Sequence, residues 1–217
     1  FYIPKLAHPD PTVDRRSGFL PATLSDTKNL GSGVKIPFFL ALNEDKDFTF
    51  TNKLYVDENP LFMGEYRQAF QNSNLIVDMG YTKGYKNTSN KKTGGDKSHL
   101  FSKFTKVFST GKNSETNLTF QTQDVSNDKY LKLYQIESDL VDYNQNYLEN
   151  SFNFSHSTND LFLSIDAKIY ETLKESYNDK YEYIFPDILI DKNLNKNESF
   201  GVLDLQSNYK VNNYDTN

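Results

Sequence analysis

The chain has 217 residues, a formal net charge of -5, no cysteine and no tryptophan, but 17 phenylalanines and 15 tyrosines. The lack of cysteine excludes thiol catalysis and internal disulfides, and the acidic balance argues against a nucleic-acid-binding protein, which needs a basic stripe. No stretch approaches the roughly 18 consecutive apolar residues of a transmembrane helix. Many aromatic residues in a polar chain are typical of a β protein, and the length fits one or two domains.

The N-terminal segment "HPDPTVDRRSGFLP" places Arg15 and Arg16 side by side, in a chain with one other arginine, Arg67. Two prolines, Pro21 and Pro37, fall inside the first strand-like stretches. Proline cannot donate to a strand ladder, so it is normally confined to edges, strand starts or bulges. These prolines therefore indicate either ordinary edge protection or a weakened seam in a closed barrel. No signal segment precedes Phe1 and no end signal follows "YKVNNYDTN", so we expect a piece of a longer protein.

Four segments alternate apolar and polar side chains with a period of two, as strands with one apolar face do. They are residues 48–56, 74–82, 147–155 and 161–170. The segment 101–108 is less regular, because Lys103 and Lys106 cannot share one face of a regular strand. We expect a bulge there or a different register of the strand.

The connections alternate in length, and this pattern carries more information than the strands. Short ones fall at 43–47, 71–74, 110–115 and 157–160, and long ones at 25–33, 83–97, 124–144 and 173–180, with 57–60 as a short exception. The lysine-rich run 83–97 is interpreted as a solvated loop, and 126–140 predicts a helical turn bearing Tyr130, Leu131 and Tyr134. Alternating short turns and long loops favour the up-and-down meander of an outer-membrane barrel over a Greek-key sandwich.

The strand charges are consistent with a membrane wall. A lysine or arginine that faces lipid at mid-bilayer costs roughly 2–4 kcal/mol, so such charges should lie opposite the apolar face. Lys53, Glu65, Arg67 and Asp78 do so, and we predict that they line a polar interior. A soluble sandwich would show the same alternation with its apolar face turned inward, so both architectures stay open at this point.

The sequence offers no catalytic constellation. His8, His99 and His156 lie far apart and match no metal-ligand spacing, and no nucleophile or phosphate-binding motif is present. Two carboxylates of an all-β glycosidase could still meet in space. We expect no enzymatic activity, no catalytic residue, no metal site and no cofactor.

Several segments resemble the LPS-assembly proteins of the LptD (OstA-like) outer-membrane family. They are "FYIPKLAHPDPTVDRRSGFLPATL", "VKIPFFLAL", "LFMGEYRQAF" and "DKYLKLYQI". The similarity runs from Phe1 to about Leu205 and is strongest over the first 70 residues. It implies that residues 1–18 are the junction from a periplasmic jelly-roll domain. Residues 19–217 would then be the N-terminal part of the barrel, the first ten or so strands, in the outer membrane of a Gram-negative bacterium.

The resemblance also implies a function and partners. Such a protein takes lipopolysaccharide from the periplasmic bridge protein LptA and releases it through the seam between first and last strands, with the plug lipoprotein LptE inside the barrel. Pro21 and Pro37 match the positions where the family weakens this lateral gate. The junction is matched by Arg15, Arg16, Ser17, Gly18 and Phe19.

At the periplasmic rim we expect the twin arginines to pair with Asp10, Asp14 or an anionic headgroup. Two alternatives to the translocon remain: another outer-membrane barrel, either a porin or a receptor, and a soluble carbohydrate-binding β-sandwich. The sandwich would fold in water without detergent. A partial barrel would not, because its outermost strands expose unpaired edges.

Overall fold

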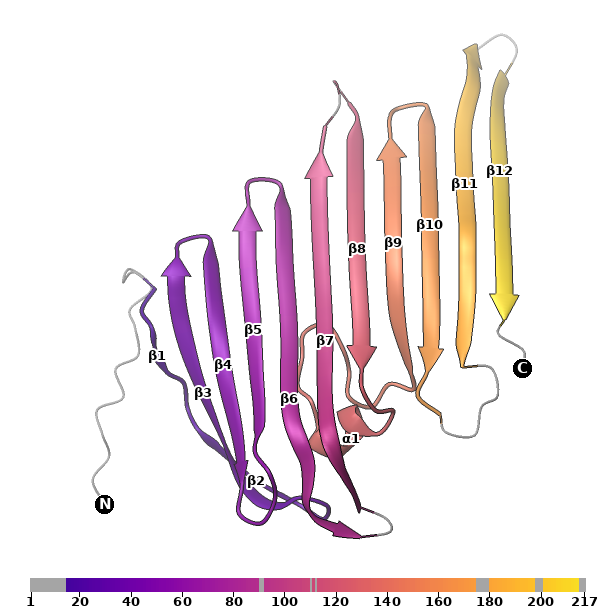
Figure 1. Ribbon diagram of the computed structural model, residues 1–217. Coiled ribbons are helices and arrows are strands. Elements are labelled where there is room, and N and C mark those ends of the chain that lie inside the picture. The colour runs from indigo at the N-terminus through magenta and orange to yellow at the C-terminus, as the bar shows by residue number, and fades with distance from the viewer. Residues whose placement is uncertain are drawn as a thin grey trace.

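The computed structural model describes residues 15–89, 92–109, 111, 113–174, 180–197 and 201–214. This part of the chain forms one large antiparallel sheet with a short helix on one face (Figure 1). Its elements in chain order are β1 (Gly18–Phe19), β2 (Thr23–Thr27), β3 (Gly31–Asn43), β4 (Lys46–Tyr55), β5 (Leu61–Phe70), β6 (Ser73–Ser89), β7 (Lys92–Phe108), β8 (Glu115–Val125), α1 (Tyr130–Tyr134), β9 (Tyr147–Ser157), β10 (Leu161–Thr172), β11 (Tyr181–Asn197) and β12 (Gly201–Tyr214).

The strands pair in the order of the sequence, so the 12-stranded sheet is an up-and-down meander from β1 to β12. β1 and β2 both pair with β3 and are two parts of one edge strand that is interrupted around Pro21. The predicted all-β antiparallel meander is confirmed. α1 has 5 residues, and no helix in the described ranges is long and apolar enough to cross a bilayer.

One face of the sheet is polar along rows that cross many strands. Directly paired residues share a face, so the register identifies each row. One row contains a polar or charged side chain on each of the seven strands β6 to β12. It consists of Asn74, Thr105, Thr119, Asn153, Asp166, Asp187 and Lys210.

The opposite face is apolar in the neighbouring rows. Successive residues of a strand point to opposite faces, so each polar row is flanked by rows of the other kind. One apolar row is Leu75, Phe104, Phe120, Phe152 and Ala167. The row on the other side is Leu118, Phe154, Ile165, Ile188 and Tyr209.

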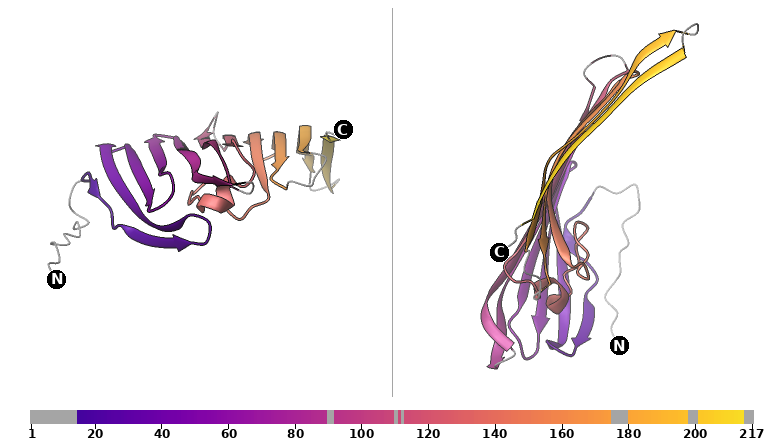
Figure 2. Two further views of the ribbon diagram at one scale, coloured as in Figure 1. Left: turned by 60° about the horizontal axis from the view of Figure 1, so that its bottom comes forward. Right: turned by 90° about the vertical axis from the view of Figure 1, so that its right-hand side faces the viewer.

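The long loop between β8 and β9 carries α1 and lies against the polar face (Figure 2). Three residues at helical spacing, Tyr130, Leu131 and Tyr134, are buried against the sheet, which confirms the predicted helical turn. Leu61, Phe101 and Val125 of the sheet and Ile136 from the loop belong to the same buried apolar cluster. The most buried apolar side chains therefore lie between the polar face and its loop.

β8 and β9 separate where this loop leaves the sheet. Their ladder ends at Gln121 and Ser151. Beyond it, the Asn150 side chain replaces a strand: its Oδ1 accepts a hydrogen bond from the Gln123 backbone N–H at 2.9 Å, and its Nδ2 donates to the Gln123 carbonyl at 3.1 Å. The diverging strands thus keep their backbone groups satisfied.

Three local expectations were wrong. β7 pairs with β6 and β8 without interruption over residues 99–106, so no bulge intervenes, and Lys103 and Lys106 simply lie on opposite faces. Most of the expected loop 83–97 is strand, since β6 extends to Ser89 and β7 begins at Lys92. The expected loop 25–33 is a tight hairpin between β2 and β3. In both places, backbone pairing overrides a polar, glycine-containing sequence.

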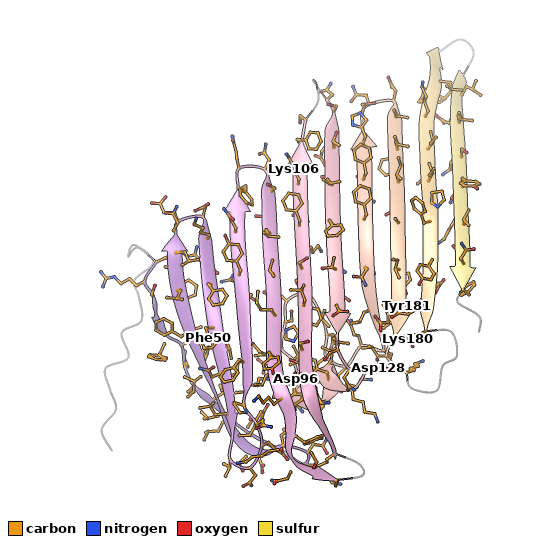
Figure 3. All side chains as sticks on the ribbon, in the orientation of Figure 1. Phe50, Asp96, Lys106, Asp128, Lys180 and Tyr181 are labelled. Carbon is orange, nitrogen blue, oxygen red and sulfur yellow. The ribbon has the colours of Figure 1, made fainter. Side chains whose placement is uncertain are left out.

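The β8–β9 loop, the longest connection in the described ranges, lies at one end of the sheet, which we call the long-loop end (Figure 1). The tight β2–β3 hairpin lies at the same end, so the expected alternation of long and short connections holds only in part. The β3–β4, β5–β6 and β9–β10 turns lie at the opposite, short-turn end. At the long-loop end, the β8–β9 loop is tied to the segment before β11 by an ion pair. Lys180 Nζ lies 3.6 Å from Asp128 and 3.0 Å from Glu171 carboxylate oxygens, and Figure 3 shows Lys180 and Asp128 together at this end.

Candidate functional site

The polar face beneath the β8–β9 loop holds a buried lysine at the end of α1. Lys53 of β4 is 8% exposed, and its Nζ donates to the carbonyls of Tyr134 at 3.2 Å and Gln135 at 2.8 Å. These carbonyls end α1 and would otherwise lack partners. A cation suits this position because a helix C-terminus carries partial negative charge. Lys53 therefore fixes the end of the helix to the sheet.

Glu137, just beyond α1, joins this lysine to the first hairpin. Its carboxylate pairs with Lys35 of β3, and its second oxygen lies 4.0 Å from Lys53 Nζ. Burial acts to raise the pKa of Glu137, but the hydrogen bond from Lys35 and the positive charges of Lys35 and Lys53 outweigh it, so the pKa lies below its ordinary value. The loop is thus held by a charged group that remains ionised at neutral pH.

A second buried network lies beneath the helix. His99 of β7 has its Nε2 3.2 Å from Asp78 of β6 and its Nδ1 3.0 Å from the Tyr130 hydroxyl, and all three residues are buried. Burial raises the pKa of Tyr130, so its hydroxyl keeps its proton. We assign that hydroxyl as donor to Nδ1, which leaves the Nε2 proton for Asp78. The network links two strands and the helix.

Gly80 makes room for the histidine ring. A Cβ at this position would lie 2.4 Å from His99 Cε1 and 3.0 Å from the Tyr130 hydroxyl. An interior strand glycine often marks such a close approach. The buried network was not predicted from the sequence, and Gly80, inside a strand pattern, is the feature that could have indicated it.

A cleft of about 770 Å³ opens between the polar face and residues 136–143 of the loop. Its charged lining is mainly acidic: Glu65 and Asp78 come from the sheet, and Asp139 and Asp142 come from the loop. Leu20 and Pro37 line it at the first hairpin. We call this space the inner cleft; it extends from the buried network to the proline-containing edge of the sheet.

That edge is irregular because of its prolines. Phe19 pairs with Phe38 and Thr23 with Lys35, so three residues of the first strand oppose two of β3, and Pro21 sits in this bulge. The Leu20 backbone N–H donates to the Pro37 carbonyl at 2.9 Å. The Pro37 nitrogen therefore also faces the first strand, where it has no proton to donate. Both prolines remove hydrogen bonds from this one hairpin.

The predicted junction residues are attached to the short-turn end of the sheet. Arg15 pairs with the buried Asp47 carboxylate, and its guanidinium lies 5.5 Å from the Phe39 ring centroid. Arg67 Nε binds the other Asp47 oxygen at 2.9 Å. Among the described residues Arg16 is exposed and has no ion pair. The suggested partners Asp10 and Asp14, and the rest of 1–14, lie outside the described residues.

The other junction residues support this attachment. Ser17 Oγ accepts a hydrogen bond from the Ala41 backbone N–H at 2.9 Å. Gly18 and Phe19 form β1, and the Phe19 ring meets the Phe38 ring edge-on at 4.8 Å. The entering chain is therefore held beside the β3–β4 turn.

The four residues predicted to line a polar interior share one face, the face that carries α1. The register pairs Lys53 with Lys35, Glu65 with Asp78, and Arg67 with Asp47. They do not form one site: Lys53 and Asp78 lie under the loop, and Arg67 lies at the short-turn end. Among the described residues, no group of three or more His, Asp or Glu side chains is placed to hold a metal ion.

Comparisons with known proteins identify no family. No protein-family model matches the chain, and no curated protein matches it. Among solved structures, two crystal structures of Pseudomonas aeruginosa OpdK, one with vanillate and one an improved structure under the name OccK1, each align with a TM-score of 0.37 and 11% sequence identity. Each alignment covers 91% of this chain and 56% of the matched chain, so this chain spans little more than half of their length.

Proposed function

We propose that this chain forms part of the wall of a β-barrel in the outer membrane of a Gram-negative bacterium. The observation that carries the proposal is the contrast between the two faces of the sheet. Within the described ranges the apolar face has no covering layer, whereas the polar face carries the loop with α1. A soluble sandwich would cover its apolar face with a second sheet. In a membrane wall, lipid covers that face and the polar face lines the interior.

The large exposed apolar area supports a membrane wall over a soluble form. Met79, Phe120 and Phe152 are 43%, 47% and 39% exposed. Fully burying one side chain of this size contributes roughly 1.5–3 kcal/mol of stability. The apolar rows contain many such side chains, so covering this face would be strongly favourable. The strands also suit a bilayer: β4, β5, β8 and β9 have 10 or 11 residues. A membrane strand needs about 9–11.

Within such a barrel we infer that the cargo is lipopolysaccharide, inserted into the outer leaflet. The resemblance to the LptD family and the weakened first hairpin support this. The edge strand is interrupted at Pro21, and at Pro37 it lacks one hydrogen bond from β3. An edge strand held this loosely would separate more readily from a last strand, and this separation would open a lateral gate. The inner cleft reaches the same hairpin. LptE would then occupy the polar interior.

The attachment of the N-terminal segment fits this orientation. Short turns face the periplasm in outer-membrane barrels. Arg15 lies beside a short turn, so residues 1–18 would enter from the periplasm, where a jelly-roll domain would receive lipopolysaccharide from LptA.

A diffusion channel is the second candidate. The polar row from Asn74 to Lys210 crosses seven strands without an apolar residue and would suit the water-filled interior of a pore. A channel requires no weak seam, so the two candidates differ in what the prolines do.

The test replaces both prolines in the full-length protein that contains this chain. Pro21→Val with Pro37→Val would restore two backbone donors at the first hairpin. If the protein is a lipopolysaccharide translocon, surface lipopolysaccharide should fall while the amount of protein in the outer membrane stays normal. Unchanged surface lipopolysaccharide, together with ion conductance of the purified protein in planar bilayers, would favour the channel instead.

A further inference from the structure

The apolar face contains a notch at Gly64. The register places Phe50 of β4, Gly64 of β5 and Met79 of β6 in one row, so a residue without a side chain stands between two large ones. Phe48, Phe62 and Tyr81 surround the gap from the adjacent rows. The resulting cavity has a volume of about 290 Å³, and Met63 and Gly80 also line it.

Ordered aromatic side chains define the shape of the notch. The Phe48 ring leans across Gly64, and a Cβ on that glycine would lie 2.7 Å from Phe48 Cζ. The rings of Phe50 and Phe62 lie nearly parallel, with centroids 6.4 Å apart and an interplanar angle of 5°. The walls are therefore aromatic and ordered, and any side chain at position 64 would fill the space that they enclose.

The lining offers almost nothing for a polar ligand. Tyr81 is its one side chain with a hydroxyl, and that hydroxyl already donates to Asp96 at 2.9 Å. Figure 3 shows Phe50 on β4 and Asp96 nearer the long-loop end of the sheet. The polar contact of Tyr81 thus lies on the side of the notch toward the long-loop end, which in a membrane wall is nearer the membrane surface, where tyrosine side chains are favoured.

We propose that the Gly64 notch binds one acyl chain of a membrane lipid at a defined site. This inference rests on the proposed function, because the notch lies on the face that would contact lipid. The occupant follows from the chemistry: the lining is apolar, the bilayer supplies acyl chains, and each buried CH₂ contributes about 0.8 kcal/mol. A chain in the notch would contact the three phenylalanine rings and Met79, whereas a chain on the flat rows meets one surface only.

The test is native mass spectrometry of the full-length protein in detergent with added phosphatidylethanolamine. We expect one lipid to remain bound after the lipids on the flat surface have been stripped. Gly64→Leu should abolish this lipid-bound species because it fills the notch. Ala167→Leu is the matched control: it adds the same side chain to a small residue of the apolar face, in the row of Phe152, and should leave the bound lipid unchanged.

A second variant distinguishes loss of the notch from misfolding of the Gly64→Leu protein. Met79→Trp narrows the notch from the other side without changing the backbone at position 64, and it should also lower lipid retention. Equal lipid retention in the wild type, both notch variants and the control would overturn the proposal, as would the absence of any retained lipid in the wild type.

The proposed function is tested separately in the same membranes. A photoreactive residue, Phe120→p-benzoylphenylalanine, lies on the apolar face outside the notch and should cross-link to lipid if this face contacts the bilayer. Cross-linking at Phe120 without lipid retention would overturn the notch alone. Failure of both would overturn the membrane wall.

Discussion

The polar face has two parts that handle charge differently. Under the β8–β9 loop, Lys53, Asp78 and His99 are each at most 8% exposed and have specific partners. Across β9 to β12 no loop covers the polar row within the described ranges, and the Asp187–Lys210 pair, at 3.5 Å, is open to solvent. A buried group without its partner is costly, whereas an exposed ion pair contributes little. Substitutions in the covered part should therefore destabilise the docked loop, whereas substitutions in the open part should have little effect.

The largest effect is expected for Lys53→Met. Methionine keeps the length of the side chain but leaves the carbonyls of Tyr134 and Gln135 without a donor. The loss should be about 2 kcal/mol of loop docking, a roughly 30-fold rise in the undocked population. The measurement is the rate of trypsin cleavage after Lys129 and Lys132 in folded protein. An unchanged rate would mean that the helix end is held by other contacts.

Asp78→Ala should have the next largest effect. It leaves the His99 Nε2 proton without an acceptor in a buried position, at a cost of about 1–2 kcal/mol. Trypsin should cleave the loop about tenfold faster, and the Tyr130 environment should change in near-ultraviolet circular dichroism. If His99 were instead exposed to water in the native protein, neither signal would change.

Acidification should release the loop more gradually. Because the folded-state pKa of Glu137 lies below its ordinary value of 4.5, its contribution to docking is complete above that value and is lost as the pH falls through the folded pKa. Cleavage by an acid-active protease should therefore rise below about pH 4.5. In Glu137→Gln the step attributable to this group should be absent; a step of the same size in both proteins would assign it to another carboxylate.

The smallest effect is expected for Asp187→Asn in the open part. The exposed pair with Lys210 contributes about 0–0.5 kcal/mol, so heat stability and loop cleavage should match those of the wild type. A loss as large as that of Asp78→Ala would show that the open part is covered in the intact protein, and would remove the distinction between the two parts.

Strand periodicity in the sequence was enough to predict the sheet where apolar and polar residues alternate. Residues 48–56, 74–82 and 161–170 fall largely in β4, β6 and β10, and the alternation placed Lys53 and Asp78 on the face opposite the apolar rows. It failed at 83–97, because the pairing of β6 with β7 extends a ladder through residues whose own preference is for turns.

The buried network could not be predicted because it depends on register. Asp78 and His99 meet only because β6 and β7 pair Gly80 directly with His99, and Tyr130 reaches them from a loop that has no strand pattern. Arg15 likewise finds Asp47 across 32 positions of sequence. Alternation identifies the face of a side chain, but a partner on that face requires the alignment of two strands.

The Asn150 amide makes the β8–β9 loop a modular insertion. Since Oδ1 and Nδ2 occupy the hydrogen-bonding positions of a peptide group beside Gln123, the ladder below them is complete without any residue of the loop. A peptide tag placed after Asn144 would therefore lengthen the loop without shifting the pairing of Leu118 with Phe154. The sheet and the β8–β9 loop that covers its polar face can therefore change in length independently of each other.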